Sequence, residues 1–324
     1  LNGGALNPES NVLFGEGGAG LFSDGKLTAR SKDRQGIRYF FETLVACGAD
    51  PGILVDAEPH VGTDQLKQVV PHMTKLIVEA GGEIRFDTRL EDVTLMQGRV
   101  SAVTINGAKS AARQVVLATG HSADDVYEML ERCGSRLDPK AFAMGVRVEL
   151  PQELVNRQQY GRYNGHPRLG PASFRLTRRA EAGARACYSF CMCPGGYVIP
   201  CASSTGAFTT NGMSYAGRAS PCANAAFLVP VEPADFGETA SGGLGFRKKI
   251  ERLAFESGGA DYGVPVTSLP RFLNPGADKP VCVRSSLIKI HEADFDAILP
   301  DFVVKTLRLT LPRMLKVFGG LNSD

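Results

Sequence analysis

The glycine-rich stretch FGEGGAGLFSDGKL, residues 14–27, constrains the fold more than any other part of the chain. Within it, Gly15, Gly17 and Gly20 satisfy G-x-G-x-x-G, the pattern of a dinucleotide-binding turn. Such a turn needs a buried strand before it and a helix after it. Only residues 12–14 form a continuous apolar run before these glycines, so the preceding strand is not predicted.

The residues after the glycines also depart from a Rossmann turn. Ser23-Asp24-Gly25 would stop a following helix within about one turn. Glycines leave backbone N–H groups open to an anion, and Lys26 adds a cation nearby. The stretch therefore predicts either an anion-facing loop or a plain glycine-rich connection.

Composition narrows the class of protein. The chain has 324 residues, is 43% hydrophobic and carries a net charge of +2. That length suits two packed units, and the charge balance gives no reason to expect a nucleic-acid partner. No apolar run is long enough for a membrane span. Eight cysteines without C-x-x-C pairs favour reduced thiols, and hence a cytoplasmic protein.

The first part of the sequence alternates between predicted helices and short strands. Helices are expected over residues 35–48 and 63–80, with Thr63 as N-cap and a kink at Pro71. Ile84 and Phe86 alternate with polar neighbours as in a strand.

A second strand and a helix are expected before the pattern changes. Val115–Ala118 read as a short buried strand, and Ser122 as the cap of the following helix.

The sequence pattern changes near Lys140. Residues 142–148 alternate strictly between apolar and polar, which predicts a strand with one buried face. Residues 187–201 read as two strands joined at Pro194-Gly195-Gly196, and helices are expected from Phe246 and across residues 299–320. We therefore expect an α+β fold in two domains, residues 1–138 and 139–324.

Eight motifs occur in order along the chain: NPESNVLFGEGGAGLFSDGKL, PHVGTDQL, AGGEIRFDTRLEDV, VVLATGHSADD, MGVRVELPQ, YSFCMCPGG, NGMSYAGR and LPDFV. Together they resemble the FAD-dependent dehydrogenases called NAD(FAD)-utilising dehydrogenases, which are similar to flavoproteins of the glutathione-reductase type. The resemblance implies an α/β flavoprotein-like fold, FAD as cofactor, a small-molecule substrate and oxidoreductase (dehydrogenase) activity. It says nothing of the oligomeric state.

The resemblance also implies which residues approach the cofactor. The glycine-rich stretch is similar to a second loop that contacts flavin and pyrophosphate, Arg89 and Leu90 to a strand beside the adenine, and Thr119 and Gly120 to a strand end at the cofactor. The residues so implied are Gly15, Glu16, Gly17, Gly18, Ala19, Gly20, Ser23, Asp24, Gly25, Lys26, Arg89, Leu90, Thr119 and Gly120.

The family pattern also has a βαβ unit upstream and a glycine-rich FAD segment downstream, and this sequence matches neither. Residues 1–138 are thus expected to be a partial FAD-binding domain, followed by a substrate or cap domain at 139–324. On this interpretation the isolated chain would purify colourless and inactive, as a fragment of the enzyme.

Cysteine and histidine supply the remaining candidates for chemistry. Period-2 alternation would place Cys187, Cys191 and Cys193 on one strand face, either as buried structural thiols, as reactive thiols, or with Cys201 as metal ligands. No metal-binding spacing is present, so no metal is expected. His121 follows the predicted strand end and is a candidate acid or base.

These observations leave three hypotheses open. The first is a flavin-dependent oxidoreductase fragment. The second is a non-catalytic binding or structural domain. The third is a thiol or metal protein centred on Cys191 and Cys193.

Overall fold

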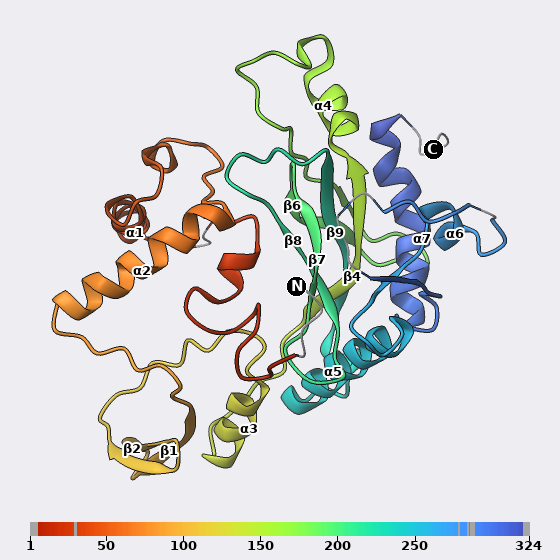
Figure 1. The fold of residues 1–324 in the computed structure, drawn as a ribbon. Coiled ribbons are helices and arrows are strands. Elements are labelled where there is room, and N and C mark those ends of the chain that lie inside the picture. The colour runs from red at the N-terminus through yellow and green to blue at the C-terminus, as the bar shows by residue number, and fades with distance from the viewer. Residues whose placement is uncertain (1–5, 29–30, 278, 284, 286–288, 320–324) are drawn as a thin grey trace.

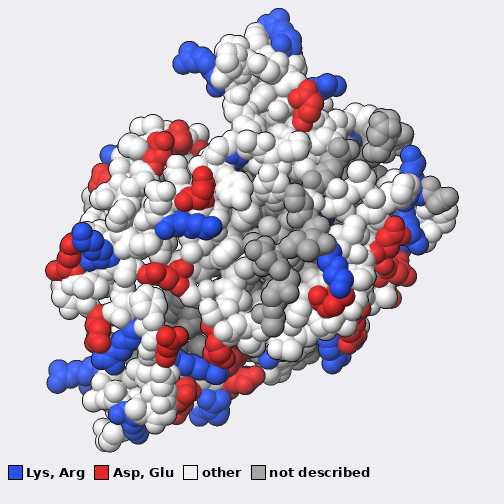
Figure 2. Space-filling model, in the orientation of Figure 1, with Lys and Arg blue, Asp and Glu red and all other residues white. Residues whose placement is uncertain are grey.

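The fold is known from a computed structural model that describes residues 6–28, 31–277, 279–283, 285 and 289–319. It combines helices with mixed sheets, so the α+β class predicted from the sequence is confirmed. Figure 1 shows a central sheet with helices on one side, while the N-terminal helices and a second, small sheet lie on the other side of the view. In Figure 2, Lys and Arg side chains lie among Asp and Glu side chains toward the margins of the face.

The central sheet has the strand order β4-β9-β6-β5 and is antiparallel throughout. Its strands are β4 (Phe142–Pro151), β5 (Thr177–Arg178), β6 (Cys187–Cys193) and β9 (Cys222–Val231). β4 and β9 pair without interruption from Phe142↔Val231 to Pro151↔Cys222. The alternation predicted for residues 142–148 is real, since Met144, Val146 and Val148 all pack against the main core.

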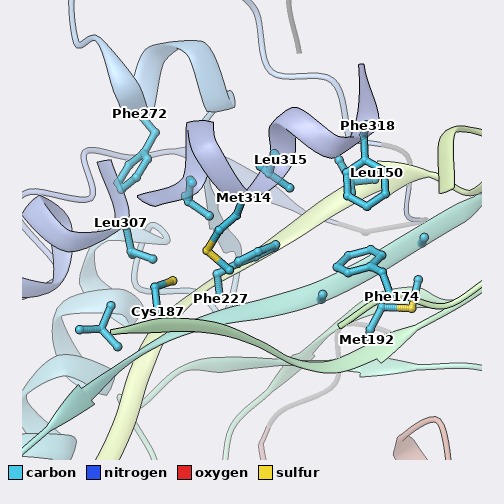
Figure 3. Packing of buried hydrophobic residues seen from close by; sticks show 14 of the residues in the cluster. Leu150, Phe174, Cys187, Met192, Phe227, Phe272, Leu307, Met314, Leu315 and Phe318 are labelled. Atoms are coloured by element: carbon cyan, nitrogen blue, oxygen red, sulfur yellow. The ribbon is translucent and has the colours of Figure 1, made fainter. Parts of the chain in front are cut away.

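The main core lies between β4, β9 and the helix α7 (Asp301–Leu315), as Figure 3 shows. Phe227 and Leu307 are both fully buried there, and α6 (Leu269–Leu273) contributes Phe272. Burying each large apolar side chain contributes roughly 1.5–3 kcal/mol, so this core is the main source of stability for the C-terminal part of the chain. Pro312 lies inside α7, and the helix continues past it to Leu315.

A second, two-stranded sheet pairs β7 (Tyr197–Cys201) with β8 (Thr209–Met213). The strands β6 and β7 are therefore consecutive, as expected, but they do not form a hairpin with each other. Other elements complete this part of the chain: α4 (Gln152–Tyr160), α5 (Ala240–Ser257), and the parallel strands β10 (Val264–Val266) and β11 (Ile290–Glu292). α5 begins before the predicted Phe246 because Thr239 caps it through the Gly242 amide.

The N-terminal part has two smaller cores. One lies between α1 (Arg34–Ala46) and α2 (Thr63–Glu79), and includes Leu44 and Val69. The other lies between α3 (Asp124–Arg132) and the sheet of β1 (Leu90–Met96), β2 (Arg99–Ile105) and β3 (Ala108–Ala111). Both predicted helices are present, and Pro71 lies inside α2.

Four local predictions in this part are wrong. Residues 84–86 are not in a strand, and Phe86 is 61% exposed. Val115–Ala118 do not form a buried strand either: no described strand pairs with them, and Val116 is 90% exposed. α2 is capped by Gly62 rather than Thr63, whose hydroxyl donates to the Ser23 carbonyl instead. Ser122 does not cap α3, because its hydroxyl bonds to the His121 ring.

No helix among the described residues combines the length and hydropathy that crossing a membrane requires.

Candidate functional site

Residues 15–20, here called the glycine loop, are exposed apart from the half-buried Gly18. Gly15, Gly17 and Gly18 have φ values of 93°, 79° and 50°, which only glycine adopts readily. At Gly17 a Cβ would also lie 2.7 Å from the Leu21 side chain. A 3₁₀ helix, Gly18–Phe22, follows instead of the long helix of a Rossmann turn.

The glycine loop is held in place on both of its flanks. On one side Val12, Leu13 and Phe22 pack against Ile199, Cys201 and Met213 of the β7–β8 sheet. On the other, the backbone of residues 25–27 bonds to residues 59–61, with Val61 N donating to Gly25 O at 2.9 Å. The loop is therefore an exposed turn on a fixed base.

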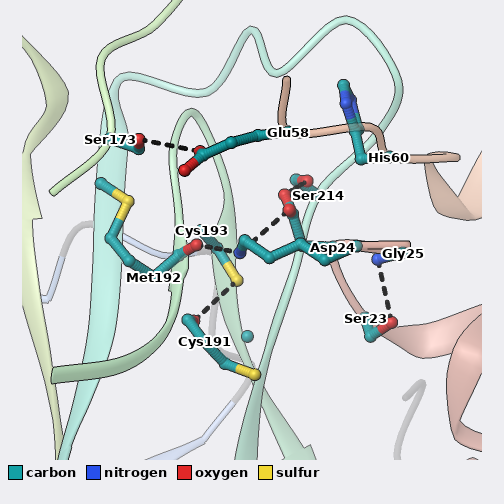
Figure 4. Close-up of polar contacts among 12 residues, drawn as sticks. Ser23, Asp24, Gly25, Glu58, His60, Ser173, Cys191, Met192, Cys193 and Ser214 are labelled. Carbon is teal, nitrogen blue, oxygen red and sulfur yellow. Dashed lines mark hydrogen bonds and ion pairs between the residues drawn. The ribbon is translucent and has the colours of Figure 1, made fainter. Parts of the chain in front are cut away.

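Asp24 lies at the centre of that base. It is 4% exposed, and Arg218 contacts both of its oxygens, Nη2 with Oδ2 at 2.6 Å and Nε with Oδ1 at 3.2 Å. Lys26 Nζ lies 3.0 Å from Oδ2, and the Ser214 hydroxyl donates to Oδ1. Figure 4 shows Asp24 and Ser214 facing each other from segments far apart in sequence. We call Asp24, Lys26, Ser214 and Arg218 the anchor cluster.

The charges of the anchor cluster determine its protonation. Burial alone would raise the pKa of Asp24, but Lys26 and Arg218, with hydrogen bonds from Ser214 and Arg218, lower that pKa below its ordinary value. Asp24 is therefore an ionised carboxylate at neutral pH. Burial also lowers the pKa of the neighbouring His60, and the positive charge of Arg218 lowers it further.

Three glycines allow the segments of this base to approach one another. A Cβ on Gly25 would lie 1.8 Å from the Val61 carbonyl oxygen, and one on Gly62 would lie 2.0 Å from Ala216 N. On Gly195 it would lie 1.6 Å from the carbonyl oxygen of Arg218. Side chains at these positions would push apart the segments that carry the anchor cluster.

Lys26 reaches from the base of the loop to a β-bulge in β6. Its Nζ donates to the Met192 carbonyl, while Arg147 Nη1 donates to the neighbouring Cys191 carbonyl at 3.3 Å. The pairing of β6 with β9 shifts between Phe190 and Cys193, and Cys191 has a left-handed φ of 42°. The predicted alternation of the cysteines is therefore wrong beyond Phe190: Cys191 is exposed, whereas Cys193 is buried.

The buried thiols are held in the protonated form. Burial raises the pKa of Cys193 to about 11 and that of Cys201 to about 12. Arg147 lies beside both, with Nη1 2.7 Å from Asn224 Oδ1, and burial lowers the pKa of this guanidinium. Among the residues that the structure describes, no group of three His, Cys, Asp or Glu side chains could hold a metal ion.

His121 lies at a different junction, between α3 and α5. Its Nδ1 is 3.0 Å from the Ser122 hydroxyl and its Nε2 is 3.4 Å from Arg247 Nη1. Partial burial of the ring lowers the pKa of His121, Arg247 lowers it further, and Asp124 opposes this. Arg247 also pairs with Asp124, so this junction holds α3 against α5.

Arg89 links three segments of the N-terminal part. Its guanidinium contacts Glu9 Oε1 at 3.2 Å and Asp125 Oδ2 at 2.8 Å, so its charge is already paired. Thr119 and Gly120 are exposed, and Gly120 has a φ of 78°.

The structure thus brings Ser23, Asp24, Gly25 and Lys26 together with the Cys191–Cys193 bulge. Arg89 and His121 make their ion pairs and hydrogen bonds at other junctions, with Glu9 and Asp125 and with Arg247. Sequence reasoning did not identify Arg218 and Ser214 as partners of Asp24. Their motif, NGMSYAGR, was the available signal, but nothing in its local pattern shows what Arg218 faces.

Two comparisons with known proteins show which family the chain belongs to. Residues 141–324 match the family described as FAD-dependent protein, C-terminal domain-like. The match covers more than half of the chain. The chain belongs to this family. An uncharacterised protein of Clostridium beijerinckii is 43% identical over 311 residues, which are 94% of this chain and 58% of that protein. The chain therefore spans little more than half the length of the curated relative it matches.

The residues of the glycine loop are compatible with the cofactor that the family name implies. The loop exposes backbone at glycines in left-handed conformation, and Gly20 has no atom within 4 Å of where its Cβ would be. A ligand can therefore reach the backbone there without meeting a side chain.

Proposed function

We propose that this chain forms part of a flavin-dependent oxidoreductase, a dehydrogenase acting on a small molecule. In this proposal the glycine loop lies against FAD within a partial FAD-binding domain, residues 1–138. Residues 139–324 form the substrate or cap domain. Membership of the FAD-dependent family supports the cofactor, and the cytoplasm is the compartment we expect.

The observation that carries this proposal is the exposed glycine loop on a buried, charged base. Ordering a flexible loop on binding costs conformational entropy and weakens affinity. A loop that is already fixed in position binds a cofactor without that cost. Here Asp24 is fixed by two cations and a hydroxyl directly below the loop. The loop therefore combines backbone access with a defined position.

The residues proposed to hold FAD are the backbone of residues 15–20 and the exposed Thr119 and Gly120, with Arg89 and Leu90 toward the adenine. Bound FAD would supply the electron-transfer chemistry. Asp24 stays ionised and serves as a structural charge rather than a proton donor. His121, which is largely neutral at pH 7, is the proposed proton acceptor.

We also propose that the architecture is of the glutathione-reductase type and that the chain is a fragment of such an enzyme. The Val115–Ala118 segment supports this, since Val116 and Ala118 are exposed and four consecutive apolar residues are typical of a strand buried in a parallel sheet. In the whole enzyme this segment would pair with strands of the FAD-binding domain.

A comparison of two proteins tests the proposal. Residues 1–324 and the longer relative of C. beijerinckii are purified without added cofactor, and each is titrated with FAD while flavin fluorescence is followed. We expect the relative to purify with FAD and residues 1–324 to bind added FAD more weakly, without turnover. A relative that carries no flavin, together with no saturable binding by residues 1–324, would overturn the proposal.

A further inference from the structure

The anchor cluster joins parts of the chain that are far apart in sequence. Asp24 lies four residues after the glycine loop, while Arg218 lies 194 positions later, after β8. Lys26 connects the same point to Met192 in β6. Ion pairs and hydrogen bonds thus link the glycine loop, which is proposed to contact the cofactor, to residues 139–324, which are proposed to bind the substrate.

The same residues are poorly placed to contact a ligand themselves. Asp24 is 4% exposed and Arg218 is 16% exposed, and each already meets the other through two atom pairs. Lys26 directs its Nζ to a backbone carbonyl and to Asp24 rather than toward the glycine loop. The charges are satisfied internally, so their effect on a bound cofactor must act through the position of the loop.

The backbone conformation of Arg218 is energetically unfavourable. Arg218 has a φ of 44°, an unfavourable value for a residue with a side chain, and its carbonyl occupies the space that a Gly195 side chain would fill. Such conformations persist where surrounding contacts determine them. At Arg218, the contact of the guanidinium with both oxygens of Asp24 offsets this unfavourable conformation.

We infer that Asp24 and Arg218 are positioning residues, which set the place of the glycine loop against the β7–β8 sheet and thereby the affinity for FAD. This inference rests on the proposed function. A buried charge that loses its partner is strongly unfavourable, so breaking the pair should release the base of the loop rather than leave it in place.

The test compares Asp24→Asn, Arg218→Met and the milder Ser214→Ala with wild-type protein. Asp235→Asn is the matched control, because Asp235 also receives two contacts from one arginine, Arg185, at 2.6 and 2.7 Å, away from the loop. Amide hydrogen exchange of residues 12–26 is measured without cofactor, and FAD affinity is measured on the same samples.

We expect exchange of residues 12–26 to rise about tenfold in Asp24→Asn and Arg218→Met, less in Ser214→Ala, and not at all in Asp235→Asn. Arg218→Lys should be intermediate, since it restores the charge but not the two-point contact. FAD affinity should fall in the same order, with a changed visible circular dichroism of the bound flavin.

The two proposals fail separately. Unchanged exchange in Asp24→Asn and Arg218→Met, or an equal rise in Asp235→Asn, would overturn the positioning role even if wild-type protein binds FAD. Wild-type protein and the longer relative both failing to bind FAD would overturn the proposed function. The exchange data would then still decide whether the pair holds the loop.

Discussion

Arg218 and Asp24 face each other side on, with Nη2 2.6 Å from Oδ2 and Nε 3.2 Å from Oδ1, although 194 positions separate them. Two contacts from one guanidinium fix the orientation of a carboxylate as well as its distance. Because Asp24 lies four residues after the glycine loop, this pair holds the segment in which the loop ends against the C-terminal part.

The first prediction concerns the stability that this pair contributes. Arg218→Met should lower the free energy of unfolding by about 3 kcal/mol, since it leaves a buried carboxylate with Lys26 as its remaining cation. Asp24→Asn combined with Arg218→Met should cost less than the two single changes together. Urea unfolding of the three variants measures this. Additive losses would show that the residues do not interact.

The second prediction tests the close backbone approach at Gly195. A Cβ there would lie 1.6 Å from the Arg218 carbonyl oxygen, and the φ of 51° is unfavourable for alanine. Gly195→Ala should therefore cost more than about 3 kcal/mol. Gly217→Ala is the control, because no atom lies within 4 Å of its Cβ position. Equal thermal midpoints for the two variants would contradict the packing described here.

The third prediction concerns pH and His60. Its folded-state pKa lies below the ordinary 6.5, so the unfolded chain binds more protons as the solution is acidified. Stability should fall as the pH falls from about 7.5 through about 5.5, and His60→Gln should reduce that slope. His121 should contribute in the same direction, since its pKa is also lowered.

Urea unfolding at a series of pH values checks the third prediction. A wild-type slope that His60→Gln leaves unchanged would contradict it. The pKa of Asp24 is also lowered, below its ordinary 3.8, so its contribution to stability should be lost only as the pH falls below about 4.

The fourth prediction distinguishes the exposed thiols from the buried ones by their reactivity. Cys191 and Cys282 are exposed, whereas Cys193 and Cys201 are buried with pKa values of about 11 and about 12. A thiolate is the reactive species, so at neutral pH an aromatic disulfide reagent should label Cys191 and Cys282 first. Cys191→Ser and Cys282→Ser should each remove one fast-reacting thiol. Rapid labelling of Cys193 in folded protein would support the alternative of a reactive-thiol centre.

Local sequence patterns predicted the elements whose hydrophobic period is strong. The spacing of Leu66, Val69 and Met73 indicated α2, and the alternation of Met144, Val146 and Val148 indicated β4. Both patterns depend only on which face of an element is buried, so near neighbours in sequence carry the information.

The features that the sequence did not predict depend on contacts between segments far apart in the chain, which local patterns do not contain. The apolar run Val115–Ala118 indicated a buried strand, but a strand also needs a partner, and no described strand pairs with it. The bulge at Cys191 depends on Lys26 and Arg147, which approach from two other segments. The role of Asp24 likewise depended on Arg218, whose position only the tertiary fold determines.

The affinity of Gly20→Val for FAD tests the central claim most directly. Gly20 has an ordinary φ and no atom within 4 Å of its Cβ position, so the fold should tolerate the change. If the loop backbone lies against the cofactor, the new side chain must meet it. We predict an unchanged unfolding midpoint and an affinity for FAD at least about tenfold weaker than that of wild-type protein, which corresponds to about 1.4 kcal/mol. Equal FAD affinities in the two proteins would contradict the assignment of the glycine loop to the flavin site.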